Sequence, residues 1–163
     1  MRHDEGMSEQ PILDPETQRR VAVHLYNRTW DLFDLGDQRT EAQTHEMVDA
    51  AHASAWHWAQ IGGLEQAVVG EWMISRVHAS AGHGEAAVLH AQRSFTLLHS
   101  DGGENLPDWL EASVQEGLAR AHLAAGDRDA AEFAAHAATD ALEKASDPED
   151  RALVAGQLGD LAL

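Results

Sequence analysis

The sequence predicts an all-α fold, and three features of the chain support that prediction. Alanine supplies an unusual share of the hydrophobic residues, which make up 44% of the chain, while valine, isoleucine and aromatic residues are sparse. Such a composition favours closely packed helices, since sheets are rich in β-branched and aromatic residues. No window alternates apolar and polar residues over the length of a strand. Capping and helix-breaking residues divide the chain into segments of helical length.

Capping residues and glycines place the first four helices. Asp14 followed by Pro15 is typical of a helix start, and Gly36 ends the amphipathic run that follows. Thr40 caps a second helix, which runs to about Ile61 and ends at a pair of glycines. The expected helices are therefore residues 15–34, a second from Thr40 to about Ile61, a third over 64–81 and a fourth over 84–99.

Three more helices follow the longest run of helix breakers, residues 100–105, which is expected to be a loop. The sequence Leu106-Pro107-Asp108-Trp109 opens a fifth helix, and Gly126 ends it. A sixth helix is expected over about 128–146, and a seventh starts at Pro148. The chain has the length of one domain, so residues 15–163 are expected to form a single helical domain. Residues 1–14 have low hydrophobicity and are expected to be disordered.

An internal repeat groups these helices into pairs. Residues 75–91 can be aligned without gaps on residues 119–135. The identical pairs are Arg76/Arg120, His78/His122, Ala81/Ala125, Gly82/Gly126, Ala86/Ala130, Ala87/Ala131 and Ala91/Ala135. Because one helix pair cannot bury its apolar face alone, a repeat of about 44 residues predicts stacked antiparallel pairs with the seventh helix as a C-terminal cap.

The run from Ala119 to Glu132 resembles the core of the tetratricopeptide repeat (TPR), in which a first helix ends at glycine and the second begins with a small residue. The resemblance covers residues 64–146. His78 and His122 stand where that family usually has tyrosine, and the repeat is longer than the usual 34 residues. Residues 51–58 and 71–77 also resemble runs in small, uncharacterised bacterial TPR-like proteins. The resemblance implies a concave groove formed by the first, third and fifth helices, lined by His78 and His122.

Composition and charge exclude several classes of function. The net charge of −17 predicts repulsion of phosphate backbones and anionic membranes, so nucleic acid and membrane partners are not expected. The same charge favours a basic protein or peptide as partner. The chain has no cysteine, its first residues are polar, and no apolar stretch reaches the length of a membrane span. We therefore expect a cytoplasmic protein.

Histidine and carboxylate residues on the second and third helices suggest a metal site. His45, Asp49 and His52 are spaced i, i+4 and i+7 on one helix face, and Glu71 and His78 are spaced i and i+7 on the next helix. If the two faces meet, they would hold a divalent transition metal as the cofactor. The alternative is that the histidines are solvated or hydrogen-bonded to neighbouring carboxylates.

Aromatic and polar residues nearby suggest a small-molecule site on the same helices. Trp56 and Trp72 are two of only five tryptophans, and Ser75, Arg76 and His78 follow on the third helix. The alternative is that these residues fill or brace the core. A buried Arg76 would then form a Glu–Arg pair across adjacent repeats.

Two functions follow from these patterns. The first is a TPR-like interaction or scaffold module that binds a partner in its concave groove. The second is a metal- or small-molecule-binding protein, with or without catalysis, whose His/Asp/Glu site lies between the second and third helices. We expect no catalytic residues, because the sequence has no nucleophile elbow or phosphate-binding glycine loop. Apolar Phe33 and Leu35 at the exposed end of the stack predict a homodimer.

Overall fold

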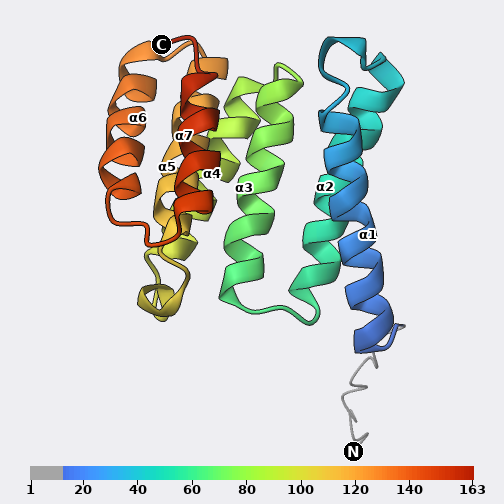
Figure 1. Ribbon diagram of the computed structural model, residues 1–163. Coiled ribbons are helices and arrows are strands. Elements are labelled where there is room, and N and C mark those ends of the chain that lie inside the picture. Colours follow the sequence, from blue (N-terminus) through green and yellow to red (C-terminus); the bar gives the residue numbers. More distant parts are fainter. Residues whose placement is uncertain (1–12) are drawn as a thin grey trace, which may run out of the picture.

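The computed structural model describes residues 13–163, and these residues form seven α-helices and no strand (Figure 1). The helices are α1 (Pro15–Phe33), α2 (Glu41–Ala59), α3 (Leu64–Ser80), α4 (Gly84–Leu98), α5 (Trp109–Ala124), α6 (Arg128–Leu142) and α7 (Pro148–Gly159). The all-α prediction with seven helices is confirmed. Most predicted ends agree within two residues, but α6 ends at Leu142 rather than near 146. Most of the segment expected to be disordered, residues 1–12, lies outside the described residues.

The capping residues act as the sequence indicates. The Asp14 carboxylate accepts a hydrogen bond from the backbone N–H of Thr17 at 3.0 Å, which satisfies one of the free donors at the start of α1. Thr40 and Gln43 form a capping box at the start of α2. Gly82 and Gly126 end α3 and α5 with φ values of +79° and +82°, a conformation that glycine adopts without strain.

The helices form three antiparallel pairs, α1/α2, α3/α4 and α5/α6, which lie side by side in chain order (Figure 1). The turns inside the second and third pairs are alike: His83 donates its backbone N–H to the His78 carbonyl, and Asp127 donates to the His122 carbonyl, both at 2.9 Å. The internal repeat in the sequence is thus a repeat in the structure. Helix α7 packs against α5 and α6 at the end of the stack.

Small residues allow the helices of each pair to approach closely. Buried alanines dominate the contacts between α3, α4 and α5 and along α6. Three buried serines donate their hydroxyls to a backbone carbonyl of the paired helix at 2.8 Å: Ser54 to Ala22, Ser75 to Ala87 and Ser94 to Val68. Each bond satisfies a hydroxyl that would be costly to bury alone. Ser75, predicted as a ligand-binding residue, is instead part of the α3/α4 interface.

A buried ionic cluster joins the second pair, the third pair and α7. The Glu116 carboxylate is fully buried and accepts hydrogen bonds from Arg76 at 3.0 Å and from Arg120 Nε at 2.8 Å. Arg120 also donates to the Gln157 carbonyl at 3.0 Å. The Arg76 guanidinium lies between 5.2 and 5.7 Å from the ring centres of Trp30, Phe33 and Trp72. Arg76 therefore braces adjacent repeats, as the structural alternative predicted.

None of the described helices is long and apolar enough to cross a bilayer.

Candidate metal centre

Three consecutive helices bring three imidazoles together. His52 comes from α2, His78 from α3 and His90 from α4, and one ring nitrogen of each lies within 4.8 Å of the others. The His52 and His78 Nε2 atoms are 3.1 Å apart. The ring centres are separated by 5.3 Å for His52 and His78, 5.3 Å for His52 and His90, and 5.6 Å for His78 and His90. This spacing is that of a cluster of metal ligands.

The packing of α3 on α4 sets the position of His90. The bonds from Ser75 to Ala87 and from Ser94 to Val68 fix the register of the two antiparallel helices. With that register, Glu71 of α3 lies opposite His90 of α4, and the Glu71 Oε2 and His90 Nδ1 atoms are 2.6 Å apart.

Glu71 supports the cluster from behind. Because the Glu71 carboxylate accepts the proton on His90 Nδ1, the Nε2 atom of His90 is left with a free lone pair. A carboxylate that holds the distal nitrogen of an imidazole is the common outer-shell arrangement of metal-binding histidines, because it fixes the tautomer and the ring orientation.

A fourth histidine, His83, contacts the far side of His78. The Nδ1 atoms of His78 and His83 are 3.1 Å apart, so one ring donates a hydrogen bond to the other. His78 therefore has its Nδ1 toward His83 and its Nε2 toward His52. When His78 Nδ1 is the donor to His83, the Nε2 atom of His78 has a free lone pair toward His52.

The electrostatics of the cluster favour the neutral form of His52 and His78. Burial, and to a smaller extent the neighbouring His52, His90 and His83, together lower the pKa of His78 to about 4. Burial is also the main cause that lowers the pKa of His52, followed by His90, while Glu71 and Asp49 act in the opposite direction. A neutral imidazole has the free lone pair that a metal requires. The proton shared between the facing Nε2 atoms of His52 and His78 has to move when one metal binds both nitrogens.

The distance between the His52 and His78 nitrogens matches tetrahedral coordination of one metal ion. Two imidazole nitrogens bound to the same tetrahedral zinc at about 2.0–2.1 Å are roughly 3.3 Å apart, close to the 3.1 Å between His52 and His78. His90 would need a small movement to join them. His90 is buried, His78 is half-buried and His52 is exposed, so the cluster opens to solvent beside His52.

The structure brings together only part of the predicted metal site. His52, Glu71 and His78 do meet, with Glu71 in a supporting position. His45 and Asp49 are exposed on α2 and lie outside the three-histidine cluster. They share a helix face with His52.

Sequence reasoning missed His90 and His83. Both lie on or next to α4, whose register against α3 is set by serine hydroxyls that the sequence pattern does not reveal. The available signal was their spacing, since His83 and His90 are seven residues apart and therefore share a face of α4.

The residues predicted to bind a small molecule do not form one site. Trp56 is 58% exposed and does not line the cavity that Trp72 lines. Trp72 lies on the side of α3 that faces α1 and α5, where its ring centre is 6.1 Å from that of Trp30. His122 occupies on α5 the position that His78 has on α3, and it is half-buried outside the imidazole cluster.

Comparison with protein-family models, curated protein sequences and solved structures finds no match for this chain. The resemblance to TPR repeats over residues 64–146 therefore stays a prediction. The function is proposed below from the geometry of the site.

Proposed function

We propose that this protein binds a divalent transition-metal ion through His52, His78 and His90. The observation that carries the proposal is the convergence of three imidazoles from three helices, with the facing nitrogens of His52 and His78 at 3.1 Å. Two further features support it. Glu71 holds the outer nitrogen of His90, and burial keeps His78 neutral.

The ligand set indicates which ions would bind. Imidazole nitrogens suit zinc, copper, nickel and cobalt, whereas magnesium and calcium prefer oxygen ligands. Three protein ligands leave a fourth position for water or another ligand, and the exposed side of His52 places that position toward solvent. The expected order of affinity places Cu²⁺ above Zn²⁺ and Ni²⁺, with Mn²⁺ much weaker.

A bound metal would connect two repeats. His52 belongs to the α1/α2 pair, while His78 and His90 belong to the α3/α4 pair. An ion held by all three would therefore stabilise the contact between the pairs, and it would raise the stability of the folded chain through linkage.

The test is calorimetric titration of chelator-treated protein, produced without a histidine tag, with Zn²⁺ and with Co²⁺. We expect one site per chain, a rise in melting temperature with Zn²⁺, and the visible absorption bands of tetrahedral Co²⁺. His52→Ala should abolish both binding and the thermal shift. Glu71→Gln should weaken binding by about 10- to 100-fold, as loss of an outer-shell partner typically does.

His45→Ala is the matched control, because His45 is exposed on the same face of α2 and outside the cluster. It should leave the affinity unchanged. Absence of a stoichiometric site for any of the metals, or equal loss in the His45 and His52 variants, would contradict the proposal.

The interaction module expected from the TPR resemblance is a second proposal. Two exposed apolar side chains favour it. Val23 is 42% exposed and borders the cavity between α1, α2 and α3, and Leu153 is 62% exposed and borders the cavity between α1, α3, α5 and α7. His78, which was expected to line the groove, instead contacts His52 of α2 and His90 of α4. Metal binding at this cluster therefore does not compete with a partner in the groove. Titration of the chain with a basic apolar peptide tests it. If the peptide docks on the apolar border, Leu153→Asp should weaken its binding. Stronger binding in this variant would show that charge alone holds the peptide, which would contradict the docking.

A further inference from the structure

A cavity of about 300 Å³ lies between α1, α3, α5 and α7, on the other side of α3 from the histidine cluster. Four aromatic rings line it: Tyr26, Trp30, Trp72 and Trp109. Its volume lies at the lower end of the range of small-molecule sites, which are mostly apolar with a few placed polar groups.

Two polar atoms at this cavity have no hydrogen-bond partner among the described residues. The indole N–H of Trp72 is a buried donor, and the Gln157 Oε1 atom is a buried acceptor. Buried polar atoms in native proteins are nearly always paired, so an unpaired donor and an unpaired acceptor beside one cavity indicate a missing partner. Neither atom has surface exposed to the cavity, so a ligand that accepts one hydrogen bond and donates another satisfies both only after the two side chains rotate toward it.

The charges around the cavity favour a neutral ligand. No residue that lines it is charged. Arg76 already lies 5.3 Å from the centre of the Trp72 ring and 5.7 Å from that of Trp30, so a ligand cation stacked on these rings would meet a positive charge. An anion would be repelled by the net charge of −17.

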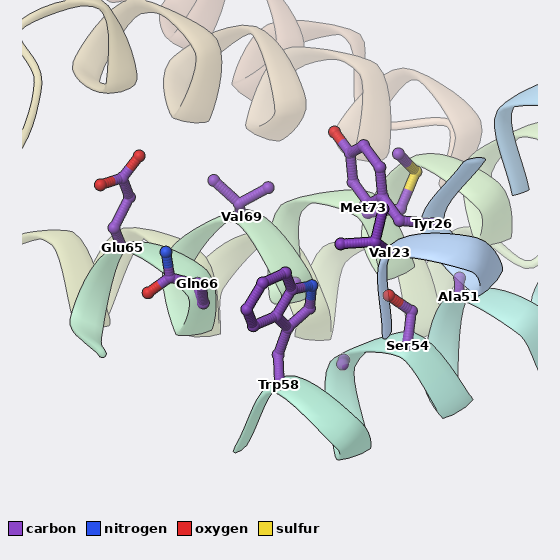
Figure 2. Close-up of a pocket in the computed structure, with 11 residues that line it drawn as sticks. Val23, Tyr26, Ala51, Ser54, Trp58, Glu65, Gln66, Val69 and Met73 are labelled. Atoms are coloured by element: carbon purple, nitrogen blue, oxygen red, sulfur yellow. The ribbon is translucent and has the colours of Figure 1, made fainter. Parts of the chain in front are cut away.

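A second, apolar cavity adjoins the first. It has a volume of about 190 Å³ and lies between α1, α2 and α3. Figure 2 shows Trp58 reaching from α2 toward Val69 of α3, with Tyr26 of α1 beyond it. Tyr26 and Val69 line both cavities and form the boundary between them. A ligand in the first cavity therefore has apolar space beside it for a substituent.

We propose that the cavity between α1, α3, α5 and α7 binds a neutral, flat, largely apolar small molecule with an amide-like edge. The ring system lies among Trp30, Trp72 and Trp109. The acceptor of the ligand takes the Trp72 indole N–H, and its donor binds the Gln157 Oε1 atom. This inference is independent of the metal centre.

The probe is 2-quinolinone, a neutral fused-ring molecule with adjacent carbonyl and N–H groups, titrated into the full-length chain labelled with ¹⁵N. The five tryptophans give five indole N–H signals, which single Trp→Phe variants assign. We expect saturable 1:1 binding that shifts the Trp72 signal most and leaves the signal of Trp56, which is 58% exposed, in place. Naphthalene, which has the rings without the amide, should bind about tenfold more weakly, and 2-naphthoate should not bind.

Two variants locate the site. Leu153→Asp places a charge on the exposed border of the cavity and should weaken binding by at least about tenfold. Gln157→Leu should reduce the preference for 2-quinolinone over naphthalene, because only the hydrogen bond to Trp72 remains. The matched control is Leu89→Asp, because Leu89 is 48% exposed on α4 and lines neither cavity.

Absence of binding, an equal shift of the Trp56 signal, or unchanged affinity in Leu153→Asp would overturn the proposal. His52→Ala should leave 2-quinolinone binding intact, so failure here and failure of the metal centre can be told apart.

Discussion

At the scale of single residues, Glu116 determines how the repeats are joined. Its buried carboxylate is the only negative charge in direct contact with Arg76 and Arg120 among the described residues. Burial lowers the pKa of Arg76, and Glu116 opposes that shift by attraction and by its hydrogen bond. Removal of the carboxylate would leave two guanidinium groups close together, one of them buried.

Glu116→Ala should therefore lower the free energy of unfolding by about 3–5 kcal/mol, the typical cost of leaving a buried charge without its partner. Urea denaturation followed by circular dichroism measures the change. Glu132→Ala is the control, because Glu132 forms an exposed pair with Arg128 at 3.1 Å, and such pairs contribute about 1 kcal/mol or less. Similar losses in the two variants would show that the buried cluster contributes no more to the free energy of unfolding than an exposed ion pair does.

The sequence predicted some of these polar contacts and missed others for a physical reason. Spacing within each helix identified His52 on α2 and His78 on α3. The internal repeat identified Arg76 and Arg120 as equivalent. The partner of Arg76 was predicted only by kind: a carboxylate in an adjacent repeat. Glu116 was missed as the partner of Arg76, and His90 as the partner of Glu71, because each lies on a different helix from that partner. The register between helices depends on packing that local patterns do not contain.

At the scale of helices, local chemistry predicted the elements well. Asp14, Thr40 and the glycines at the ends of α3 and α5 act locally, so their effect can be read from sequence. The end of α6 was placed too late, because Glu143 and Lys144 are good helix formers and Ala145 is buried beyond the helix. Tertiary packing overrode helix propensity there.

Glycines inside helices show how closely α3 and α5 approach. A Cβ atom on Gly117 of α5 would lie 2.8 Å from Cδ1 of Trp72, whereas a Cβ on Gly156 of α7 would meet nothing within 4 Å. Gly117 therefore permits the contact between the two helices at the aromatic cavity, and Gly156 serves no such contact.

Gly117→Ala should lower the free energy of unfolding by about 1–2 kcal/mol, because the overlap with Trp72 outweighs the gain in helix propensity. Gly156→Ala should raise it by about 0.5–1 kcal/mol, since only the propensity changes. Thermal unfolding of the two variants beside the parent chain measures both. Stabilisation by both substitutions would mean that the Trp72 ring moves into the cavity without cost.

At the scale of the whole molecule, the stack of pairs carries a large excess of negative charge. The chain has 28 acidic and 11 basic residues, and the described ion pairs involve few of the acidic ones. Folding brings the remaining carboxylates closer together, so repulsion opposes the compact state.

The predicted homodimer stays a prediction. Leu35 is 37% exposed, while Phe33 is half-buried and close to Arg76.

Added salt should therefore stabilise the fold. The screening length falls from about 30 Å at 0.01 M to about 8 Å at 0.15 M, which weakens repulsion between distant carboxylates more than it weakens the buried Arg76–Glu116 pair. We expect the melting temperature of chelator-treated protein to rise by a few degrees over this range, where about 1 kcal/mol corresponds to about 2–4 °C for a chain of this size. Differential scanning calorimetry measures the rise.

A variant with fewer charges separates screening from other effects of salt. Asp140 and Glu143 are exposed near the end of α6, where the helix dipole disfavours negative charge, and neither takes part in a described ion pair. The double variant Asp140→Asn, Glu143→Gln should melt higher than the parent at low salt and respond less to added salt. A fall in melting temperature with salt in the parent chain would instead mean that attractive pairs outweigh repulsion across the molecule.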